Sequence, residues 1–210
     1  KAFLRDLRHP YFKGGLARDK VKAVIAVDLY GQCAEYDALE ALCRNEKLVL
    51  IEDAAQSFGA AYKGRKACTF GDIACTSFFP AKPLGCYGDG GAVFTADAKL
   101  ADAVRMIRNH GQAQRYMHDA VGLNGRLDTL QAAVLLAKFD TFVNKEIDRR
   151  NDVAARYSRA LTPLAENGAI VLPAVREHNV SVWAQYSVRV LSGKRDALQA
   201  HLKDAGVPTA

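Results

Sequence analysis

The sequence predicts an α/β fold with a mostly parallel sheet, because short apolar runs alternate with a stretch of helical spacing. Residues 21–27, 48–52 and 73–79 are apolar runs of the kind that form buried strands. Between the first two runs, residues 34–45 place apolar side chains at three-residue spacing, as on one face of a helix. Strand, helix and strand in this order form a βαβ unit, which implies parallel pairing and a right-handed crossover.

Further elements continue this pattern toward the middle of the chain. Residues 60–66 predict a small hairpin that turns at Lys63-Gly64. Residues 92–95 predict another strand, and residues 97–108 predict a helix. We therefore expect a sheet with flanking helices.

The second half of the chain begins with a long helix. Residues 128–161 carry apolar side chains at mostly three- and four-residue steps, which predicts a helix of roughly 50 Å at about 1.5 Å per residue. Proline, asparagine and glycine within residues 163–168 indicate a linker. Residues 181–191 then alternate like an antiparallel strand, and residues 194–205 return to helical spacing. A helix of this length is typical of a bridge between a large domain and a smaller one.

Composition excludes several classes of protein. The chain has 210 residues, half of them hydrophobic, which is enough for a sizeable core. Its five cysteines form no CxxC pair and their number is odd, which argues against a disulfide framework or a zinc site and favours a reducing cytoplasm. There is no long apolar span, so we expect no membrane association. The net charge of +6 is scattered, so we expect no nucleic-acid partner, whereas it suits an anionic substrate.

One lysine lies in an unusual setting. The segment Ser77-Phe78-Phe79-Pro80-Ala81-Lys82-Pro83-Leu84-Gly85 follows a predicted buried strand, and prolines restrict the backbone on both sides of Lys82. A lysine on a rigid, partly desolvated turn can act as an amine nucleophile or as a proton shuttle. Most loop lysines are solvated surface charges, so this segment alone leaves both interpretations open.

A carboxylate occupies a second informative position. The run 48–52 ends in Asp53, which therefore lies at the carboxyl end of a predicted parallel strand, where open α/β sheets bind their ligands. A lone aspartate here is more often a cap for the next segment. Asp53 is followed by Gln56, Ser77 and Lys82, and this combination favours a binding site.

These residues resemble the DegT/DnrJ/EryC1/StrS family of sugar aminotransferases, which are fold-type-I enzymes that depend on pyridoxal phosphate (PLP). The likeness runs from about Val21 to the end of the chain. It implies that Lys82 binds the cofactor covalently and moves the substrate proton, and that Asp53 pairs with the pyridinium nitrogen. It also implies that Gln56 lies beside the 3-oxygen of the cofactor and that Ser77 contacts its phosphate.

A second cluster implies a dimer. In the motif Gly122-Leu123-Asn124-Gly125-Arg126, Asn124 matches the family asparagine that reaches the PLP phosphate of the partner subunit, so the resemblance implies a homodimer with shared sites. Arg126 can present a planar fork to a substrate carboxylate or phosphate, although a structural salt bridge is an equal alternative. His110 and Tyr30 match positions near the substrate site, and capping of a helix end is an alternative for His110.

The resemblance also fixes the expected organisation. We expect a partial PLP-binding large domain in residues 1–127, a connecting helix in residues 128–161, and the start of a small α+β domain in residues 162–210. Relatives extend further at both ends, so the chain resembles a piece of a longer enzyme. Many relatives have histidine where this sequence has Asp28, which predicts altered substrate or donor contacts.

The expected function is the transfer of an amino group from an amino acid to a keto-sugar nucleotide in surface polysaccharide or lipopolysaccharide biosynthesis. Glutamate is the expected amino donor. The segment around Asn124 and the run Trp183-Ala184-Gln185-Tyr186 look most like members that aminate a 3-keto uronic acid sugar. Two alternatives stay open. A dehydratase that uses pyridoxamine phosphate would have histidine in place of Lys82, and a truncated module would keep the sheet without catalysis.

Overall fold

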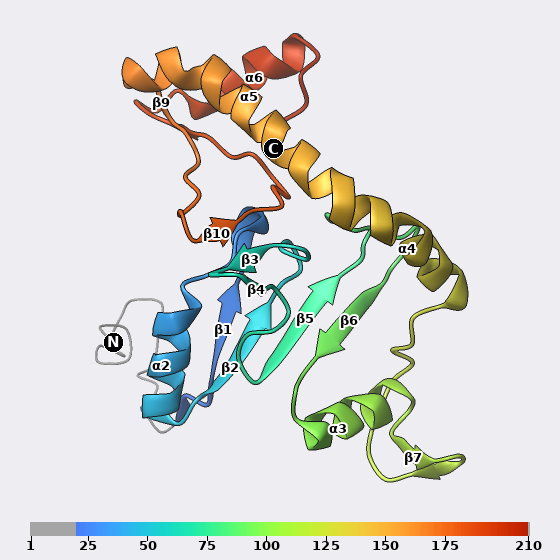
Figure 1. The fold of residues 1–210 in the computed structure, drawn as a ribbon. Coiled ribbons are helices and arrows are strands. Elements are labelled where there is room, and N and C mark those ends of the chain that lie inside the picture. The colour runs from blue at the N-terminus through green and yellow to red at the C-terminus, as the bar shows by residue number, and fades with distance from the viewer. Residues whose placement is uncertain (1–19, 210) are drawn as a thin grey trace.

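The computed structural model describes residues 20–209, and a four-stranded sheet lies at its centre (Figure 1). The strand order is β1 (Ala23–Val27), β2 (Val49–Asp53), β5 (Ile73–Ser77) and β6 (Gly91–Phe94). β1 pairs with β2 and β2 with β5 in parallel, whereas β6 runs antiparallel to β5. The prediction of an α/β fold with a mostly parallel sheet is confirmed.

The βαβ unit forms as predicted. Helix α2 (Tyr36–Glu46) connects β1 to β2 and buries Tyr36 and Cys43. The ring of Tyr36 is fully buried and stacks on Phe70 at a centroid distance of 4.0 Å. Burial of such large rings removes apolar surface from water and fixes the helix against the sheet.

Short elements surround the sheet. β3 (Ala61–Tyr62) and β4 (Arg65–Lys66) form the predicted hairpin, and the 3-10 turn η2 (Leu29–Gly31) follows β1. Helix α3 (Ala98–Arg108) begins after Asp97, whose carboxylate accepts hydrogen bonds from two backbone N–H groups of the first turn. The small hairpin of β7 (Gln112–Gln114) and β8 (Met117–His118) follows α3.

The long helix exists, but it is neither uniform nor as short as predicted. It consists of α4 (Thr129–Thr141), a π-helical turn η3 (Phe142–Glu146) and α5 (Ile147–Glu166). Phe142 and Ile147 are five residues apart, and the wider turn allows both to be buried against Gly59. The predicted linker was placed too early, because Pro163 lies inside α5 and the helix ends only at Glu166.

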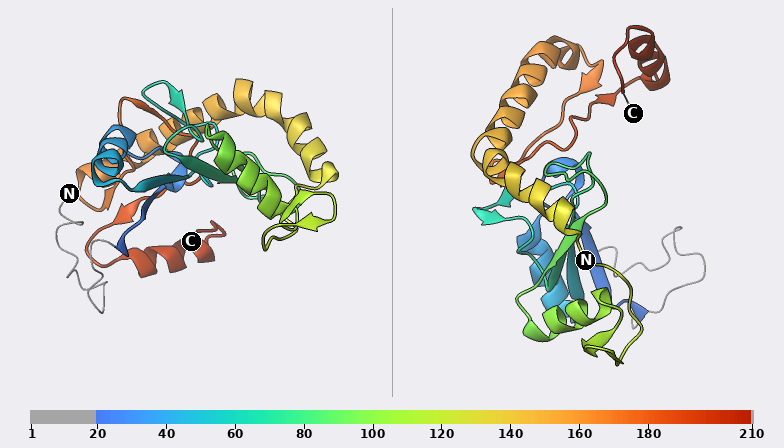
Figure 2. Two further views of the ribbon diagram at one scale, coloured as in Figure 1. Left: turned by 90° about the horizontal axis from the view of Figure 1, so that it is seen from below. Right: turned by 90° about the vertical axis from the view of Figure 1, so that its right-hand side faces the viewer.

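The C-terminal part lies apart from the sheet, at the far end of α5 (Figure 2). It contains β9 (Ile170–Val171), which pairs antiparallel with β11 (Arg189–Val190), and helix α6 (Arg195–Asp204). β10 (Asn179–Val180) instead joins β3, and so connects this part to the large sheet region. In the described part of the chain, no helix combines the length and the apolar character that crossing a membrane requires.

The predicted strand over residues 181–191 was mostly wrong. Only Arg189–Val190 is a strand, and the backbone of residues 181–184 bonds elsewhere. Val182 N donates to Gly31 O at 2.9 Å, and Trp183 has a positive φ of 48°. The alternation of apolar residues in the sequence therefore reflects contacts on both sides of an irregular segment.

Candidate active site

The site residues predicted on the sheet share one edge of it. The heads of β1, β2 and β5 point toward α5 in Figure 1, so the carboxyl ends of these strands lie together. Val27 is paired with Asp53, and Asp53 with Cys75, two residues before Ser77. The sheet therefore brings Asp53 and Ser77 to the same edge.

Asp53 is half-buried at this edge. One carboxylate oxygen, Oδ1, accepts a hydrogen bond of 3.1 Å from the backbone N–H of Ala55. Asp53 therefore does cap the segment that follows β2, as the alternative interpretation of this residue predicts. The other oxygen, Oδ2, accepts no hydrogen bond from residues 20–209, so it can accept one from a cationic or N–H group of a ligand.

Lys82 lies in the loop that joins β5 to β6, and the backbone of this loop is tightly bonded. Cys86 N donates to Phe78 O and Lys82 N donates to Phe79 O, both at 2.8 Å. A side chain at Gly85 would meet Pro80 O at only 2.6 Å, so the loop requires glycine at that position. Lys82 itself is half-buried. The predicted rigid turn is present.

Side chains of the long helix hold this loop from one side. Gln131 Oε1 accepts from Tyr87 N at 2.8 Å, and Lys138 Nζ donates to Gly85 O. Arg150 Nη2 lies 3.4 Å from Pro83 O. Sequence reasoning missed these roles. The only signal was the spacing of Gln131 and Lys138, since residues seven apart share one face of a helix.

Gln56 and Tyr30 are brought together at the end of β1. Gln56 Oε1 accepts a hydrogen bond of 2.6 Å from Tyr30 N. Tyr30 has a φ of 61°, a left-handed conformation that is uncommon for a bulky residue and is often found at functional sites. Tyr30 also lines a cavity of about 310 Å³ between the loop after β1 and the C-terminal segment, with Leu172, Trp183 and Gln185 on its other walls.

Two buried acids lie beneath this edge. The Asp28 carboxylate accepts hydrogen bonds from Ala34 N at 2.9 Å, Tyr36 Oη at 2.7 Å and Ser57 Oγ at 2.8 Å. The Glu52 carboxylate accepts bonds from two backbone N–H groups of residues 68–70. Burial raises the pKa of Asp28 and raises the pKa of Glu52 to about 7. Asp28 thus faces the interior and is fully buried, and the expectation that this position alters substrate or donor contacts stays a prediction.

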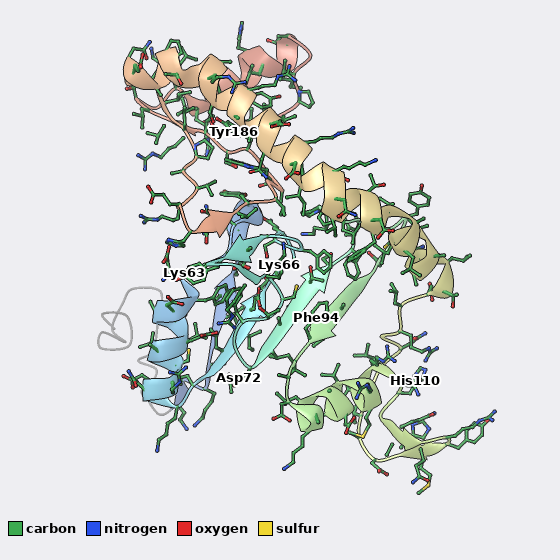
Figure 3. All side chains as sticks on the ribbon, in the orientation of Figure 1. Lys63, Lys66, Asp72, Phe94, His110 and Tyr186 are labelled. Atoms are coloured by element: carbon green, nitrogen blue, oxygen red, sulfur yellow. The ribbon has the colours of Figure 1, made fainter. Side chains whose placement is uncertain are left out.

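Asn124, Arg126 and His110 lie elsewhere. Figure 3 shows His110 beside α3, well apart from Asp72 and away from the heads of β1, β2 and β5. Arg126 Nη1 donates to Asn109 Oδ1 at 3.0 Å and lies 3.2 Å from His110 Nε2. Asn124 is exposed and forms a backbone bridge with Asn109. Within one chain, this cluster is therefore not brought together with Lys82.

The alternatives for this second cluster are partly resolved. Arg126 forms no ion pair with a carboxylate in residues 20–209, and its partners there are Asn109 and His110. His110 follows the end of α3 with a φ of 61°, the left-handed conformation common just after a helix. His110 therefore lies just after the end of α3 and also contacts Arg126, so a structural role at the helix end and a place in the cluster with Arg126 are compatible.

At the sheet edge, the donor set suits a phosphorylated aromatic aldehyde. It combines a primary amine on a fixed loop, a carboxylate with an uncommitted oxygen, and the hydroxyl of Ser77, which accepts a bond of 3.2 Å from Phe79 N. An amine can bind an aldehyde carbon, a carboxylate can hold a protonated ring nitrogen, and a hydroxyl can donate to phosphate. The edge thus has the features of a cofactor site in an α/β enzyme.

Comparison with known proteins identifies the family. The model of the DegT/DnrJ/EryC1/StrS aminotransferase family matches residues 16–210. The chain is 54% identical over 191 residues to the UDP-2-acetamido-2-deoxy-3-oxo-D-glucuronate aminotransferase of Pseudomonas aeruginosa, covering 91% of this chain and 51% of that one. The chain therefore belongs to the DegT/DnrJ/EryC1/StrS aminotransferase family. It spans about half the length of the curated relatives that it matches.

Solved structures agree with this assignment. A DegT/DnrJ/EryC1/StrS aminotransferase from Brucella abortus superposes with a TM-score of 0.84 at 42% identity, covering 96% of this chain and 52% of that one. NtdA from Bacillus subtilis, solved with bound cofactor PMP, superposes with a TM-score of 0.77 at 27% identity, covering 89% and 42%. The fold inferred from the sequence is confirmed.

Proposed function

We propose that this chain carries the lysine-bearing part of a PLP-dependent aminotransferase that aminates a keto-sugar nucleotide with an amino acid, glutamate, as donor. The observation that carries the proposal is the convergence of Asp53, Ser77 and the Lys82 loop at the carboxyl edge of β2 and β5. Membership of the family and the names of the relatives support it.

Each residue at the edge has a role in holding the cofactor. The amine of Lys82 would bind the aldehyde carbon C4′, Asp53 would hold the proton on the ring nitrogen, and Ser77 would donate to the phosphate. Gln56 would lie beside the 3-oxygen. When bound, PLP accepts the electron pair left on the substrate carbon after deprotonation. Lys82, released by the amino donor, would then carry the proton between that carbon and C4′.

The second cluster supports a homodimer with shared sites. The described contacts of Asn124 and Arg126 are with Asn109 and His110, and none of them is with Lys82, Asp53 or Ser77. In the proposed dimer, Asn124 would bind the partner's PLP phosphate, and Arg126 would bind a carboxylate or phosphate of the partner's substrate. The contacts from Asn109 and His110 hold one nitrogen of the Arg126 guanidinium and leave its other nitrogens for an anion.

The substrate that fits best is a 3-keto sugar acid linked to a nucleotide. The 54% identical relative acts, by its name, on a 3-oxo-glucuronate sugar of UDP. A uronic acid provides a carboxylate for Arg126, and the nucleotide suits the net charge of +6. The cavity at Tyr30 lies beside Gln56 and would admit part of this substrate. The enzyme would act in the cytoplasm, and its product would be used in the biosynthesis of surface polysaccharide, including lipopolysaccharide.

The test is amino transfer by the full-length protein. Purified protein with PLP and ¹⁵N-glutamate should place ¹⁵N on a UDP-3-keto uronic acid sugar, as followed by mass spectrometry. The matched control is the UDP-3-keto sugar without the carboxylate, which should react more slowly because Arg126 has no anion to bind. Absence of label from both sugars and from dTDP-keto sugars would refute the proposal. The dehydratase alternative is not favoured, because such an enzyme would have histidine at the position of Lys82.

A further inference from the structure

The loop that carries Lys82 is attached to the long helix at separate points along its backbone. Gln131 on α4 accepts from Tyr87 N at 2.8 Å, Lys138 on α4 donates to Gly85 O, and Arg150 on α5 lies 3.4 Å from Pro83 O. All of these contacts join a side chain of the helix to the backbone of residues 83–87. They therefore fix the path of the loop and do not depend on the identity of its side chains.

The geometry at Arg150 extends this attachment to a third segment. Glu146 Oε1 accepts from Arg150 Nε at 3.0 Å and from Nη2 at 2.7 Å, which orients the guanidinium. Arg150 Nη1 then lies 3.5 Å from Trp183 O. The guanidinium thus lies between the carbonyl of Pro83, next to Lys82, and the C-terminal segment that walls the cavity at Tyr30.

Packing also holds this loop, because Leu84 and Cys86 are buried in the hydrophobic core, with 3% and 1% of their surface exposed. Lys82 N and Cys86 N bond back to Phe79 O and Phe78 O, so the base of the loop is closed by its own backbone. Phe79 and Tyr87 are exposed, at 49% and 80%, so the loop gains little hold from burying those rings. The buried side chains anchor the loop, and the polar contacts with the helix then set the backbone path of residues 83–87 on either side of that anchor.

We propose that Gln131, Lys138 and Arg150 are positioning residues for Lys82: they hold the lysine loop on the long helix so that its amine stays aligned with Asp53. This inference rests on the proposed function, because alignment matters only if Lys82 is the reacting amine. A reacting group must be held in its productive geometry, and small displacements reduce the rate strongly. Lys138 has the largest effect, since a charged donor to a half-buried carbonyl gives a stronger bond than a neutral one.

The structure offers a matched pair of variants. Lys138→Met removes the donor and keeps the length of the side chain. Lys145→Met makes the same change at an exposed position of the π-helical turn, where Lys145 has no described partner. Gln131→Leu removes the acceptor for Tyr87 N, and Lys138→Arg restores a cationic donor.

The first measurement needs no cofactor. Hydrogen exchange of the full-length, cofactor-free protein, resolved at the amides of Lys82, Cys86 and Tyr87, should be about tenfold faster in Lys138→Met and Gln131→Leu, as expected when one hydrogen bond of this kind is lost. Lys145→Met should exchange like the wild type, and Lys138→Arg should recover most of the protection. Exchange within twofold of wild type in both Lys138→Met and Gln131→Leu would overturn the proposal. If Lys138→Met fails to fold, Gln131→Leu alone decides.

The second measurement separates positioning from a merely structural role. In the PLP-loaded enzyme, kcat should fall about tenfold in Lys138→Met while KM for the sugar nucleotide stays within twofold, because the loop aligns the amine and does not bind the sugar. A loss confined to KM, or a change of kcat equal to that in Lys145→Met, would contradict the proposal. If wild-type protein transfers no amine, the proposed function fails, whereas the exchange result still shows whether the helix holds the loop.

Discussion

Asp53 on β2 is the parallel pairing partner of Cys75 on β5. Because β5 continues for two more residues, this pairing places Ser77 and the start of the Lys82 loop just beyond the Asp53 carboxylate. The relationship arises from strand register alone. It explains how residues separated by 29 positions in the sequence, Asp53 and Lys82, come to serve one edge of the sheet.

The role of Asp53 is tested by removing its charge. Asp53→Asn keeps an acceptor for Ala55 N, so the local turn should persist. A carboxylate paired with a ring nitrogen in a dry site can contribute several kcal/mol, and about 1.4 kcal/mol corresponds to a tenfold rate change. We expect kcat to fall by several orders of magnitude with an unchanged circular dichroism spectrum. Asp102→Asn, on the surface of α3, is the control. A loss under tenfold would mean that Asp53 is only a cap.

The buried acids predict a pH dependence of stability. Burial raises the pKa of Glu52 from 4.5 to about 7, so the folded protein binds a proton that the unfolded chain releases at lower pH. The resulting stabilisation is complete below the unfolded pKa and is lost as the pH rises from 4.5 to about 7. The free energy of unfolding from urea titrations should therefore decrease across this window.

Glu52→Gln provides the check on that slope. Glutamine cannot titrate, so the decrease between these pH values should become smaller, although the variant should be less stable at every pH because one backbone N–H of residues 68–70 loses its acceptor. An unchanged slope would show that Glu52 does not bind the proton.

Ser57 is expected to stabilise the segment that carries Gln56. Its hydroxyl donates to the buried Asp28 carboxylate at 2.8 Å, and Ser57→Ala would leave that oxygen with one donor fewer. The expected loss is about 1–3 kcal/mol in the free energy of unfolding. Thr69→Ala, which removes an exposed hydroxyl bonded to Lys66 O, is the matched control and should cost less than about 1 kcal/mol. Equal losses in the two variants would contradict the role given to Ser57.

The proposed shared site predicts complementation between inactive subunits. Lys82→Ala and Asn124→Ala proteins should each be strongly impaired alone. A mixed dimer would have one site with both changes and one site with neither, so activity should return to a fraction of wild type after subunit exchange. Exchange is verified by native mass spectrometry. An active monomer in sedimentation, or an inactive mixture after verified exchange, would refute the assignment of Asn124.

The sequence contained enough information for the fold and for the sheet-edge residues, because both depend on local patterns. The apolar runs at 48–52 and 73–79 define their own strands, and a residue that follows a parallel strand must lie at its carboxyl end. The position of Asp53, Ser77 and Lys82 at one edge follows from this rule. The burial of Asp28 does not follow from this rule, because Tyr36 and Ser57 contact Asp28 only after α2 has packed on the sheet.

Other features depend on contacts that no local pattern encodes. The π-helical turn at Phe142–Glu146 appears because Gly59 leaves room for two buried side chains five residues apart. The segment 181–184 avoids a strand where Val182 N donates to Gly31 O and Trp183 adopts a positive φ. The hydrogen bond from Lys138 Nζ to Gly85 O likewise forms only because the long helix lies beside the loop that carries Lys82.

The central claim is that Lys82 is the amine that binds PLP. The most direct measurement is reduction of the full-length protein with borohydride in the presence of PLP, followed by peptide mass spectrometry. We predict a single pyridoxyl addition on the peptide that contains Lys82, and no addition at that position in Lys82→Ala, which should also lack amino transfer. Addition at a different lysine in the wild type, or a Lys82→Ala variant that keeps most of its kcat, would contradict the account.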